Sequence, residues 1–233
     1  MEQSTYMLKV LSRINLPIHY TSGIDCLESC LNKKHFQNYP KSITYQYNSN
    51  GFRDTEWPKN FSDVIWCVGD SFTVGIGQPH EETWPAVLEK KTGTRCLNLG
   101  EDGCSNDTIA LRAQEICKFY KPKLIVVMWS YLSRRRINGV DVQYDDNNFG
   151  VANDLTNFAK NLKMVNELPV DSIHLLVPNA FENNKLLREK YPNLITTSNL
   201  DYARDYHHFD IKTSTVVCDL IIKKISNLDK TSK

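Results

Sequence analysis

A serine, a histidine and an aspartate in this chain have the types and spacing of a nucleophile with its base. Ser71 follows the apolar run Val64–Val68 and the dipeptide Gly69-Asp70, so it falls at the end of a predicted buried strand. In open α/β sheets, ligands and chemistry gather at the carboxyl ends of the strands. A substrate could approach the Ser71 hydroxyl there, which makes Ser71 the first candidate for a nucleophile.

A serine hydroxyl needs a base that takes its proton and a third group that orients the base. Asp205 and His208 stand three positions apart, and on a single helical turn both side chains would face the same way. The aspartate could hold one imidazole nitrogen while the other nitrogen addresses the serine. His207 and Asp210 are also three apart with the order reversed, and they remain the alternative pair.

The elements that must position these residues alternate along the chain. Apolar runs predict strands at 64–68, 95–99, 124–129 and 172–177, with weaker candidates at 43–47 and 194–199. Apolar periodicity predicts helices at 24–36, 82–91, 105–120, 155–168, 184–191 and 213–228. Strand and helix alternate at least three times from Val64, which predicts βαβ units and a parallel sheet with helices on both faces. Trp66 and Trp129 lie on predicted strands and are expected in the core.

Local signals mark several ends of these elements. Gly93 is a predicted helix C-cap, and Ser105 or Asn106 a predicted N-cap. The segment Tyr131–Gly150 is polar and follows a strand, so we interpret it as a lid or substrate loop. Its run Arg134-Arg135-Arg136 is either a solvated face or a grip on an anionic group of the substrate.

Composition limits the class of protein. The chain has 233 residues, of which 41% are apolar, with 28 Lys and Arg against 27 Asp and Glu. This length fits one domain with a three-layer core. The balanced charge gives no reason to expect nucleic acid as a partner or broad attraction to an anionic membrane.

Several other kinds of site are disfavoured by spacing. The seven cysteines show no zinc-type pattern, and His19, His35, His80 and His174 have no partner at metal-ligand spacing, so no metal and no cofactor is expected. No apolar run approaches the roughly 20 residues that span a bilayer, and residues 1–9 lack the apolar core of a signal peptide. We therefore expect a cytoplasmic protein with reduced cysteines.

Two other glycine-containing motifs fail on single positions. The nucleophile elbow Gly-x-Ser-x-Gly of α/β-hydrolases requires a glycine where Thr73 stands. Phosphate-binding loops require a different sequence after Gly75-Ile76-Gly77, which is followed here by Gln78-Pro79-His80. Nucleotide binding is therefore not expected.

Gly69-Asp70-Ser71 together with Asp205-x-x-His208 resembles the first and last sequence blocks of the SGNH (GDSL-type) serine hydrolase family. Residues 48–53, Asn-Ser-Asn-Gly-Phe-Arg, look like a lead-in that some members carry before the first block. The resemblance covers Tyr47 to Asp210. It implies a flavodoxin-like, three-layer α/β sandwich with a mainly parallel sheet over residues 46–233, preceded by an N-terminal extension, residues 1–45, of unclear structure.

The resemblance also implies roles for single residues. Ser71 would be the nucleophile, His208 the general base and Asp205 its orienting carboxylate. Gly103 fits the glycine of the second block, so the backbone amides of Ser71 and Gly103 would form the oxyanion hole. Asn106 is either a further donor of that hole or a helix cap.

One family block is missing. The family carries Gly-x-Asn-Asp after the third strand, and its Asn completes the oxyanion hole, whereas residues 128–134 here read Met-Trp-Ser-Tyr-Leu-Ser-Arg. Loss of one oxyanion donor typically lowers the rate by about 10²–10³-fold. Asn106, Ser130 or Arg134 could substitute, and otherwise activity would be weak or lost.

Two functions therefore follow from the sequence. The first is an esterase that cleaves an acyl or O-acetyl group from a small-molecule, carbohydrate or lipid ester. The alternative is a non-catalytic member of the same fold that serves as a binding or structural module. The sequence also allows residues 1–47 to be an arm for assembly, and it leaves the oligomeric state open.

Overall fold

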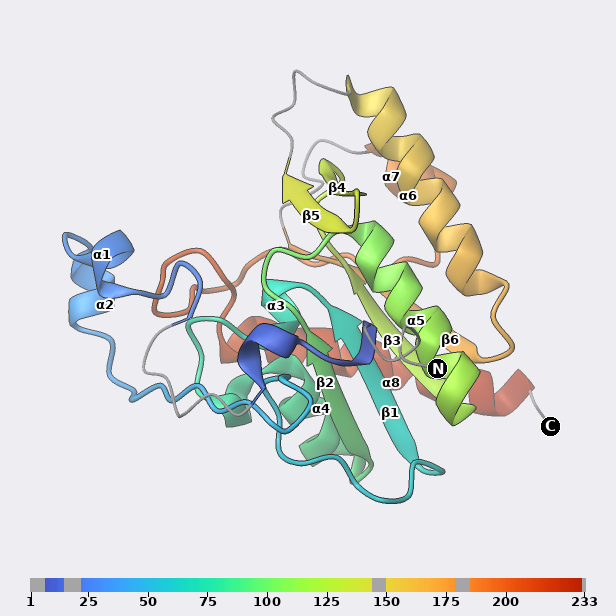
Figure 1. The fold of residues 1–233 in the computed structure, drawn as a ribbon, viewed down its shortest axis with the longest axis horizontal. Helices are drawn as coiled ribbons and strands as arrows, with labels where there is room; N and C mark the ends of the chain where they lie inside the picture. Colours follow the sequence, from blue (N-terminus) through green and yellow to red (C-terminus); the bar gives the residue numbers. More distant parts are fainter. Residues whose placement is uncertain (1–6, 15–21, 144–149, 179–184, 232–233) are drawn as a thin grey trace.

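A parallel four-stranded sheet forms the centre of the protein. The computed structural model describes residues 7–14, 22–143, 150–178 and 185–231 (Figure 1). The strands are β1 (Val64–Gly69), β2 (Arg95–Gly100), β3 (Leu124–Trp129) and β6 (Asp171–Leu176), in the order β2-β1-β3-β6. All three pairings are parallel. The four main predicted strands are thus confirmed, with ends shifted by at most one residue.

Helices cover both faces of this sheet. The helices α5 (Asn106–Tyr120) and α6 (Gly150–Asn166) lie on one face, and α4 (Trp84–Thr92) and α8 (Ile211–Thr231) lie on the other (Figure 1). The side chains of β1 alternate between the two layers: Trp66 and its neighbours at even positions pack beneath α5, whereas Ile65 and Cys67 pack beneath α4 and α8. This architecture confirms the predicted three-layer α/β sandwich.

The helix boundaries follow local chemistry. Ser105 is the N-cap of α5, and its hydroxyl accepts the N–H of Thr108 at 3.3 Å. Gly93 ends α4 in the left-handed conformation, as predicted. The first turn of α4 begins at Trp84 rather than at the predicted residue 82, because residues 80–82 form a 3₁₀ turn, η3 (His80–Glu82). Near the C-terminus, α7 (Lys185–Lys190) matches the described part of the helix predicted at 184–191.

Two weaker strand predictions are wrong. Residues 43–47 keep the alternating burial of a strand, with Ile43, Tyr45 and Tyr47 buried, but the segment belongs to neither sheet. The carbonyl of Thr44 accepts a hydrogen bond from Arg53 at 3.3 Å, so this acceptor serves a side chain. Residues 194–199 contribute a single parallel bridge, between Ile195 and Leu175, instead of a fifth strand.

The helix predicted at 24–36 is divided in two. The structure has α1 (Leu27–Cys30) and α2 (Lys34–Gln37), each of one turn, and the short 3₁₀ helix η2 (Leu11–Arg13) precedes them. The N–H of Lys33 bonds to the Cys30 carbonyl, which tightens the chain between α1 and α2.

The described part of the predicted lid, residues 131–143, contains a hairpin. Strands β4 (Arg134–Ile137) and β5 (Val140–Gln143) pair antiparallel. The Asp141 carboxylate accepts hydrogen bonds from the hydroxyls of Ser105 and Thr108, at 2.5 and 2.6 Å, which attaches the hairpin to the start of α5. Arg135 forms an ion pair with Asp154 of α6. The hairpin is therefore held to two helices, while residues 144–149 of the predicted segment lie outside the described residues.

The described ranges contain neither a membrane-spanning helix nor a cluster of metal ligands. None of the described helices is long and apolar enough to cross a membrane. Among the same residues, no group of three or more His, Cys, Asp or Glu side chains is arranged to hold a metal ion.

Part of the chain before residue 45 belongs to the core. Leu8 and Val10 are buried and join the cluster that contains Phe52 and Trp66. The N–H of Val10 also donates to the Asn50 carbonyl at 2.9 Å. Residues 7–14 therefore pack on the sandwich, and the predicted domain start at residue 46 stays a prediction.

This packing gives a matched pair of variants. We expect Leu8→Ala to lower the free energy of unfolding by about 2–4 kcal/mol, since Leu8 is 3% exposed. Leu11→Ala should change it by less than about 0.5 kcal/mol, since Leu11 is 61% exposed. Denaturant unfolding of the two variants and the parent measures both effects. Equal effects of the two substitutions would contradict the packing of this segment.

His174 is a half-buried histidine that the fold holds neutral. Its Nδ1 accepts the indole N–H of Trp129 at 3.2 Å, and its Nε2 lies 2.9 Å from Asn166 Oδ1. Burial lowers the pKa of His174 to about 4. The unfolded chain therefore takes up a proton at this position near its ordinary pKa of 6.5, before the folded chain does.

We expect His174 to make the protein acid-sensitive. Because its pKa is lower in the folded state, stability should fall by about 3 kcal/mol as the pH drops from about 6.5 to about 4. His174→Gln should flatten the curve of unfolding free energy against pH in this window. His80→Gln, at a histidine whose side chain is 40% exposed, is the control, and His174→Gln should flatten the curve more than this control does. A curve unchanged in His174→Gln would contradict this assignment.

Candidate active site

Ser71 stands at a tight turn between β1 and the one-turn helix α3 (Ser71–Val74). Asp70 caps this helix, and its Oδ1 accepts the N–H of Phe72 at 3.0 Å. A Cβ at Gly69 would come within 2.1 Å of Thr73 Oγ1, and a Cβ at Gly100 within 2.3 Å of the Val74 nitrogen. Both strand ends therefore need glycine, because α3 lies directly against them.

The structure brings Ser71, His208 and Asp205 together. Ser71 Oγ lies 2.8 Å from His208 Nε2, and His208 Nδ1 lies 2.5 Å from Asp205 Oδ2. All three residues are buried. The ring of Phe72 packs against the His208 ring with the centroids 4.6 Å apart. The geometry is that of a hydroxyl, an imidazole and a carboxylate joined in series.

The segment that holds Asp205 and His208 is a turn and not part of a helix, which corrects the helical-turn expectation. Tyr206 adopts a left-handed conformation with φ of 57°, so the chain reverses between the two residues. Asp205 Oδ1 accepts the N–H groups of His207 and His208, both at 3.0 Å. These two bonds fix the aspartate while its other oxygen faces the imidazole.

The alternative pair of His207 and Asp210 is not formed. Asp210 instead accepts the N–H groups of Lys212 and Thr213, at 3.0 and 3.3 Å, at the start of α8. Its carboxylate thus caps a helix.

The surroundings set the charge of this turn. Burial raises the pKa of Asp205, but the hydrogen bond to His208, the charge of that imidazole and two backbone N–H groups together lower it below its ordinary value. Burial and the neighbouring His208 both lower the pKa of His207. Asp205 is therefore ionised at neutral pH, as an orienting carboxylate must be.

The backbone N–H groups of Ser71 and Gly103 both lie close to the end of β1. Among the described residues, neither the Ser71 N–H nor the Gly103 N–H donates to a protein acceptor. The turn that contains Gly103 lies against the end of β1, because the N–H of Glu101 and the Sγ of Cys104 both bond to the Gly69 carbonyl. Gly103 has a φ of 77°, and nothing lies within 4 Å of the position of a Cβ.

The Asn106 side chain forms hydrogen bonds with the backbone that follows β3. Its Oδ1 accepts the Ser130 N–H at 2.8 Å, and its Nδ2 donates to the carbonyls of Ser130 and Tyr131, at 3.2 and 3.4 Å. Asn106 is the first residue of α5, whereas Ser105 is the cap. Its hydrogen bonds therefore join α5 to the end of β3.

Arg134 lies where the expected third family block would end. Its Nη1 donates to Asp70 Oδ2 at 2.9 Å and to Ser130 Oγ at 2.8 Å, and Ser130 Oγ lies 2.6 Å from the same carboxylate oxygen. Arg134 is 9% exposed, and its buried Nε has no hydrogen-bond partner among the described residues. The interpretation of the arginine run as a solvated face is thus wrong for Arg134, which is buried beside the residue that precedes Ser71.

The lead-in residues 48–53 support the loop after α3. The guanidinium of the buried Arg53 donates to the carbonyls of Val74, Gly75 and Gln78, the last at 2.7 Å. Asn48 Oδ1 accepts the N–H groups of Asn50 and Phe52, which forms the turn that precedes Arg53. The sequence marks residues 48–53 as a motif. It does not show that Arg53 binds a loop more than 20 residues away.

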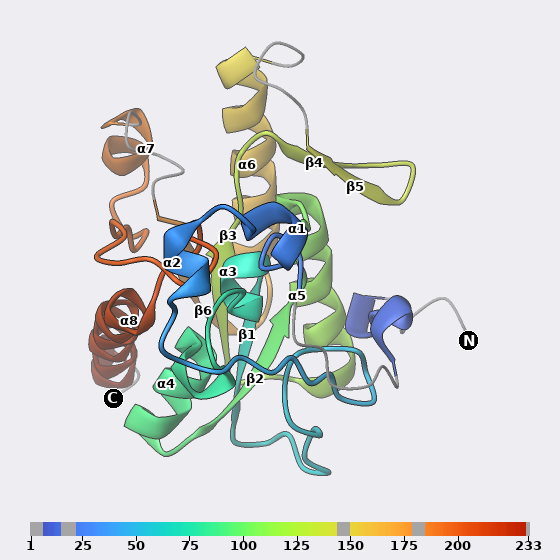
Figure 2. The ribbon, with the colours of Figure 1, turned by 90° about the vertical axis from the view of Figure 1, so that its left-hand side faces the viewer.

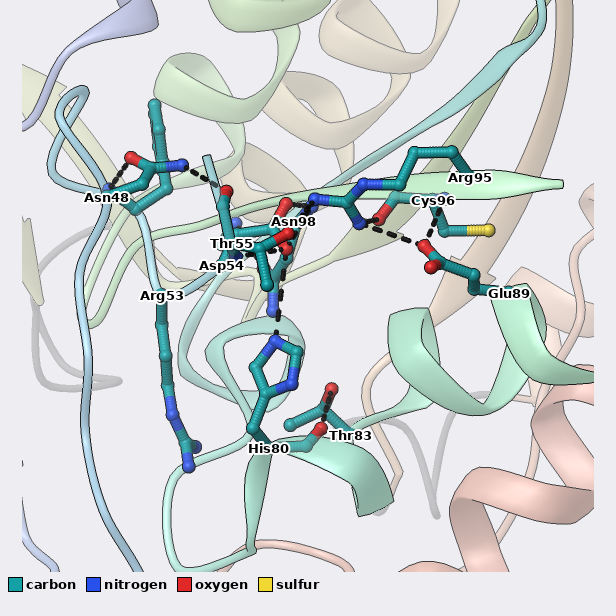
Figure 3. Close-up of polar contacts among 12 residues, drawn as sticks. Asn48, Arg53, Asp54, Thr55, His80, Thr83, Glu89, Arg95, Cys96 and Asn98 are labelled. Atoms are coloured by element: carbon teal, nitrogen blue, oxygen red, sulfur yellow. Dashed lines mark hydrogen bonds and ion pairs between the residues drawn. The ribbon is translucent and has the colours of Figure 1, made fainter. Parts of the chain in front are cut away.

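Asp54, the residue after Arg53, forms hydrogen bonds with β2. Its carboxylate accepts hydrogen bonds from Arg95 at 2.8 Å and from the Asn98 N–H at 3.0 Å (Figure 3). The same residue lines a polar cavity of about 380 Å³ with His80, Thr55 and Glu81. This cavity contains none of the residues Ser71, Asp205 and His208 in its lining.

Sequence reasoning missed the role of the Asp70 carboxylate. The motif Gly69-Asp70-Ser71 draws attention to the serine, but the aspartate is fully buried and collects Arg134, Ser130 and the Phe72 amide. A buried carboxylate needs such partners. Its position next to a nucleophile candidate at a strand end was the available signal.

Comparison with known proteins agrees with this architecture. No protein-family model and no curated protein sequence matches the chain. Among solved structures, the psychrotrophic esterase EstA from Pseudoalteromonas sp., inhibited by monoethylphosphonate, is 16% identical with a TM-score of 0.50 over 72% of this chain and 100% of that one. A member of the lipolytic protein G-D-S-L family from Veillonella parvula DSM 2008 is 14% identical with a TM-score of 0.45, over 69% and 96%. A family two carbohydrate esterase from Clostridium thermocellum, in complex with cellohexaose, is 14% identical with a TM-score of 0.48, over 73% and 65%.

At sequence identities this low, structural likeness is evidence for the fold alone. The parallel sheet β2-β1-β3-β6, the helices on both of its faces and the likeness to EstA together confirm the fold that the sequence blocks predicted. The chain has the α/β fold of the SGNH (GDSL-type) hydrolases.

Proposed function

We propose that this protein is a serine hydrolase that cleaves a carboxylic ester through an acyl-enzyme on Ser71. The observation that carries the proposal is the series of hydrogen bonds from Ser71 Oγ through His208 to Asp205, at 2.8 and 2.5 Å. Such a series activates a hydroxyl for attack on a carbonyl carbon. The likeness of the fold to an esterase adds weight.

The proposed reaction has two halves. Ser71 Oγ attacks the ester carbonyl while its proton passes to His208 Nε2. The tetrahedral intermediate then breaks the bond to the alcohol oxygen, and the alcohol leaves with the proton from His208. Water attacks the acyl-enzyme with His208 again as base, which releases the acid and restores Ser71. Asp205 holds the imidazole in the required tautomer throughout.

The oxyanion would be held by backbone amides. The N–H groups of Ser71 and Gly103 are the donors that we assign, because neither donates to an acceptor in the described part of the chain. Asn106 was the third candidate, but its amide is used by the backbone of Ser130 and Tyr131. In its place we assign Arg134, whose fixed positive charge lies beside Asp70 and whose buried Nε–H lacks a partner in the described part of the chain.

The proposed substrate is an acyl or O-acetyl ester of a carbohydrate or lipid. The buried triad suits a neutral ester, because its members lie away from solvent. The acyl group and the alcohol stay open in this proposal.

A second function is supported by the missing asparagine after β3. Residues 128–134 supply Ser130 and Arg134 instead, and both bind Asp70. A member of this fold without a complete oxyanion hole would bind its ligand without turnover. Such a module would bind glycans or a partner protein while Ser71 stays unreactive.

A fluorophosphonate probe separates these two functions. We expect the probe to label Ser71 in the folded protein, since attack on phosphorus needs the same base and the same oxyanion donors as attack on an ester. Ser71→Ala should abolish labelling and lower esterase activity by about 10³-fold or more without altering the melting temperature. Intact mass and peptide mapping identify the labelled residue.

Ser105→Ala is a matched control, because it removes a buried hydroxyl that contacts Asp141 and the Thr108 amide and belongs to neither the triad nor the oxyanion hole. It should remain labelled at Ser71. Labelling at another residue, or near-full esterase activity in Ser71→Ala, would end the proposal. A folded protein without any labelling would favour the binding module.

A double-variant cycle tests the assignment of Arg134. Arg134→Met should destabilise the protein by about 3–5 kcal/mol, because it leaves the Asp70 carboxylate buried without its cation. Asp70→Asn combined with Arg134→Met removes both charges and should recover most of that stability. If Arg134 stabilises the oxyanion, the double variant should still react about 10²-fold more slowly with the probe.

Arg136→Met is the control for loss of an arginine in the same strand. Arg136 forms its ion pair with Asp141, at 3.5 Å, and not with Asp70. A double variant that regains both stability and the parental labelling rate would limit Arg134 to a structural role.

A further inference from the structure

A segment that the family blocks do not include reaches the turn with Asp205 and His208. The Lys33 ammonium donates to the Asp205 carbonyl at 3.3 Å, and the His35 ring lies 3.0 Å from the Ala203 carbonyl. The Phe36 ring packs under the guanidinium of Arg204 at 4.9 Å. Figures 1 and 2 show α1 and α2 beside the loop that leads into α8.

Asp25 is the charged centre of this contact. Its side chain is fully buried, and it accepts two hydrogen bonds from Arg204, from Nε to Oδ1 at 2.8 Å and from Nη2 to Oδ2 at 2.6 Å. This fork geometry fixes the orientation of both side chains. Arg204 directly precedes Asp205, so the pair holds the backbone from which the triad carboxylate projects.

Tyr45 closes the contact into a ring of hydrogen bonds. Its hydroxyl donates to Asp25 Oδ2 at 2.7 Å and accepts the Gly77 N–H at 2.8 Å. The Gly77 carbonyl in turn accepts the Arg204 N–H at 2.9 Å. Burial raises the pKa of Tyr45, so its hydroxyl keeps the proton that it donates. Asp25, Tyr45, Gly77 and Arg204 thus join three distant parts of the chain: the N-terminal segment, the loop after α3 and the triad turn.

We infer that Asp25 is a positioning residue for catalysis, through which residues 22–47 fix the turn that carries Asp205 and His208. The inference rests on the proposed function, because it assigns Asp25 to the triad of that reaction. A buried ion pair contributes little net stability compared with an apolar replacement, so geometry is the property that this pair supplies. A displacement of about 1 Å at a reacting group can lower a rate by about 10²-fold.

Asp25→Asn tests this directly, because it keeps the shape of the side chain and removes its charge. We expect the rate of fluorophosphonate labelling at Ser71 to fall by about 10–100-fold, and kcat to fall with KM unchanged. The downfield proton resonance of the bond between His208 and Asp205 should weaken or shift. This NMR signal reports the geometry of the triad without any substrate.

Asp54→Asn is the matched control. Asp54 is also a buried carboxylate paired with an arginine, Arg95 (Figure 3). Within the described chain it makes no hydrogen bond to residues 201–210. Its labelling rate should stay within about 2-fold of the parent, and its NMR signal should not move, whatever its effect on melting temperature.

Two further variants decide the case if Asp25→Asn does not fold. Tyr45→Phe removes only the hydroxyl that joins Asp25 to Gly77 and should give a smaller loss of labelling rate. Arg204→Lys should retain more activity than Arg204→Gln, because it keeps the charge that faces Asp25.

The outcomes distinguish failure of the proposed function from failure of the positioning role alone. A parent protein with neither labelling nor the downfield resonance overturns the proposed function, and the positioning role falls with it. A parent with both signals, together with folded variants of Asp25, Tyr45 and Arg204 that match it in rate and resonance, overturns the positioning role alone. Equal losses in Asp54→Asn and Asp25→Asn would also overturn it, since the effect would then be general destabilisation.

Discussion

The close contact of α3 with the ends of β1 and β2 is the constraint on which the site depends. Gly69 and Gly100 have no room for a Cβ, with Thr73 Oγ1 and the Val74 nitrogen at 2.1 and 2.3 Å from that position. The contact forces the chain out of β1 at once and leaves Ser71 at the first position of a one-turn helix. Its amide then donates to no acceptor among the described residues, and its hydroxyl faces the turn before α8. Gly69 and Gly100 thus determine where the nucleophile candidate stands.

Three buried carboxylates organise the space around Ser71. Asp70 binds Arg134 and Ser130, Asp205 binds His208, and Asp25 binds Arg204. Each is completely buried, so each needs a cation or several donors close by. Their partners come from different parts of the chain, so the charges fix the relative positions of loops that the sheet alone would leave free. Stability and site geometry therefore rest on the same contacts.

The end of β3 is where this chain differs from the pattern of its fold. Asn106 fills the space with a side chain that binds the backbone of Ser130, and Arg134 brings a guanidinium to Asp70. A guanidinium has a fixed charge and several N–H donors, whereas an asparagine amide is neutral. The replacement thus changes the electrostatics beside the nucleophile candidate and leaves the backbone that holds it intact.

The sequence by itself determined the four strands, the alternating helices and the blocks around Ser71 and His208. Buried parallel strands need continuous apolar runs, and turns need glycine and aspartate, so these features are local and can be predicted. Tertiary structure decided the rest. The alternation at 43–47 predicted burial correctly, but the segment joins neither sheet, and the Thr44 carbonyl accepts a hydrogen bond from Arg53 instead. The choice of Asp205 over Asp210 depended on a left-handed Tyr206 and on the cap of α8. The link from Asp25 to Arg204 spans 179 positions, and no local pattern encodes a contact that only the packed chain creates.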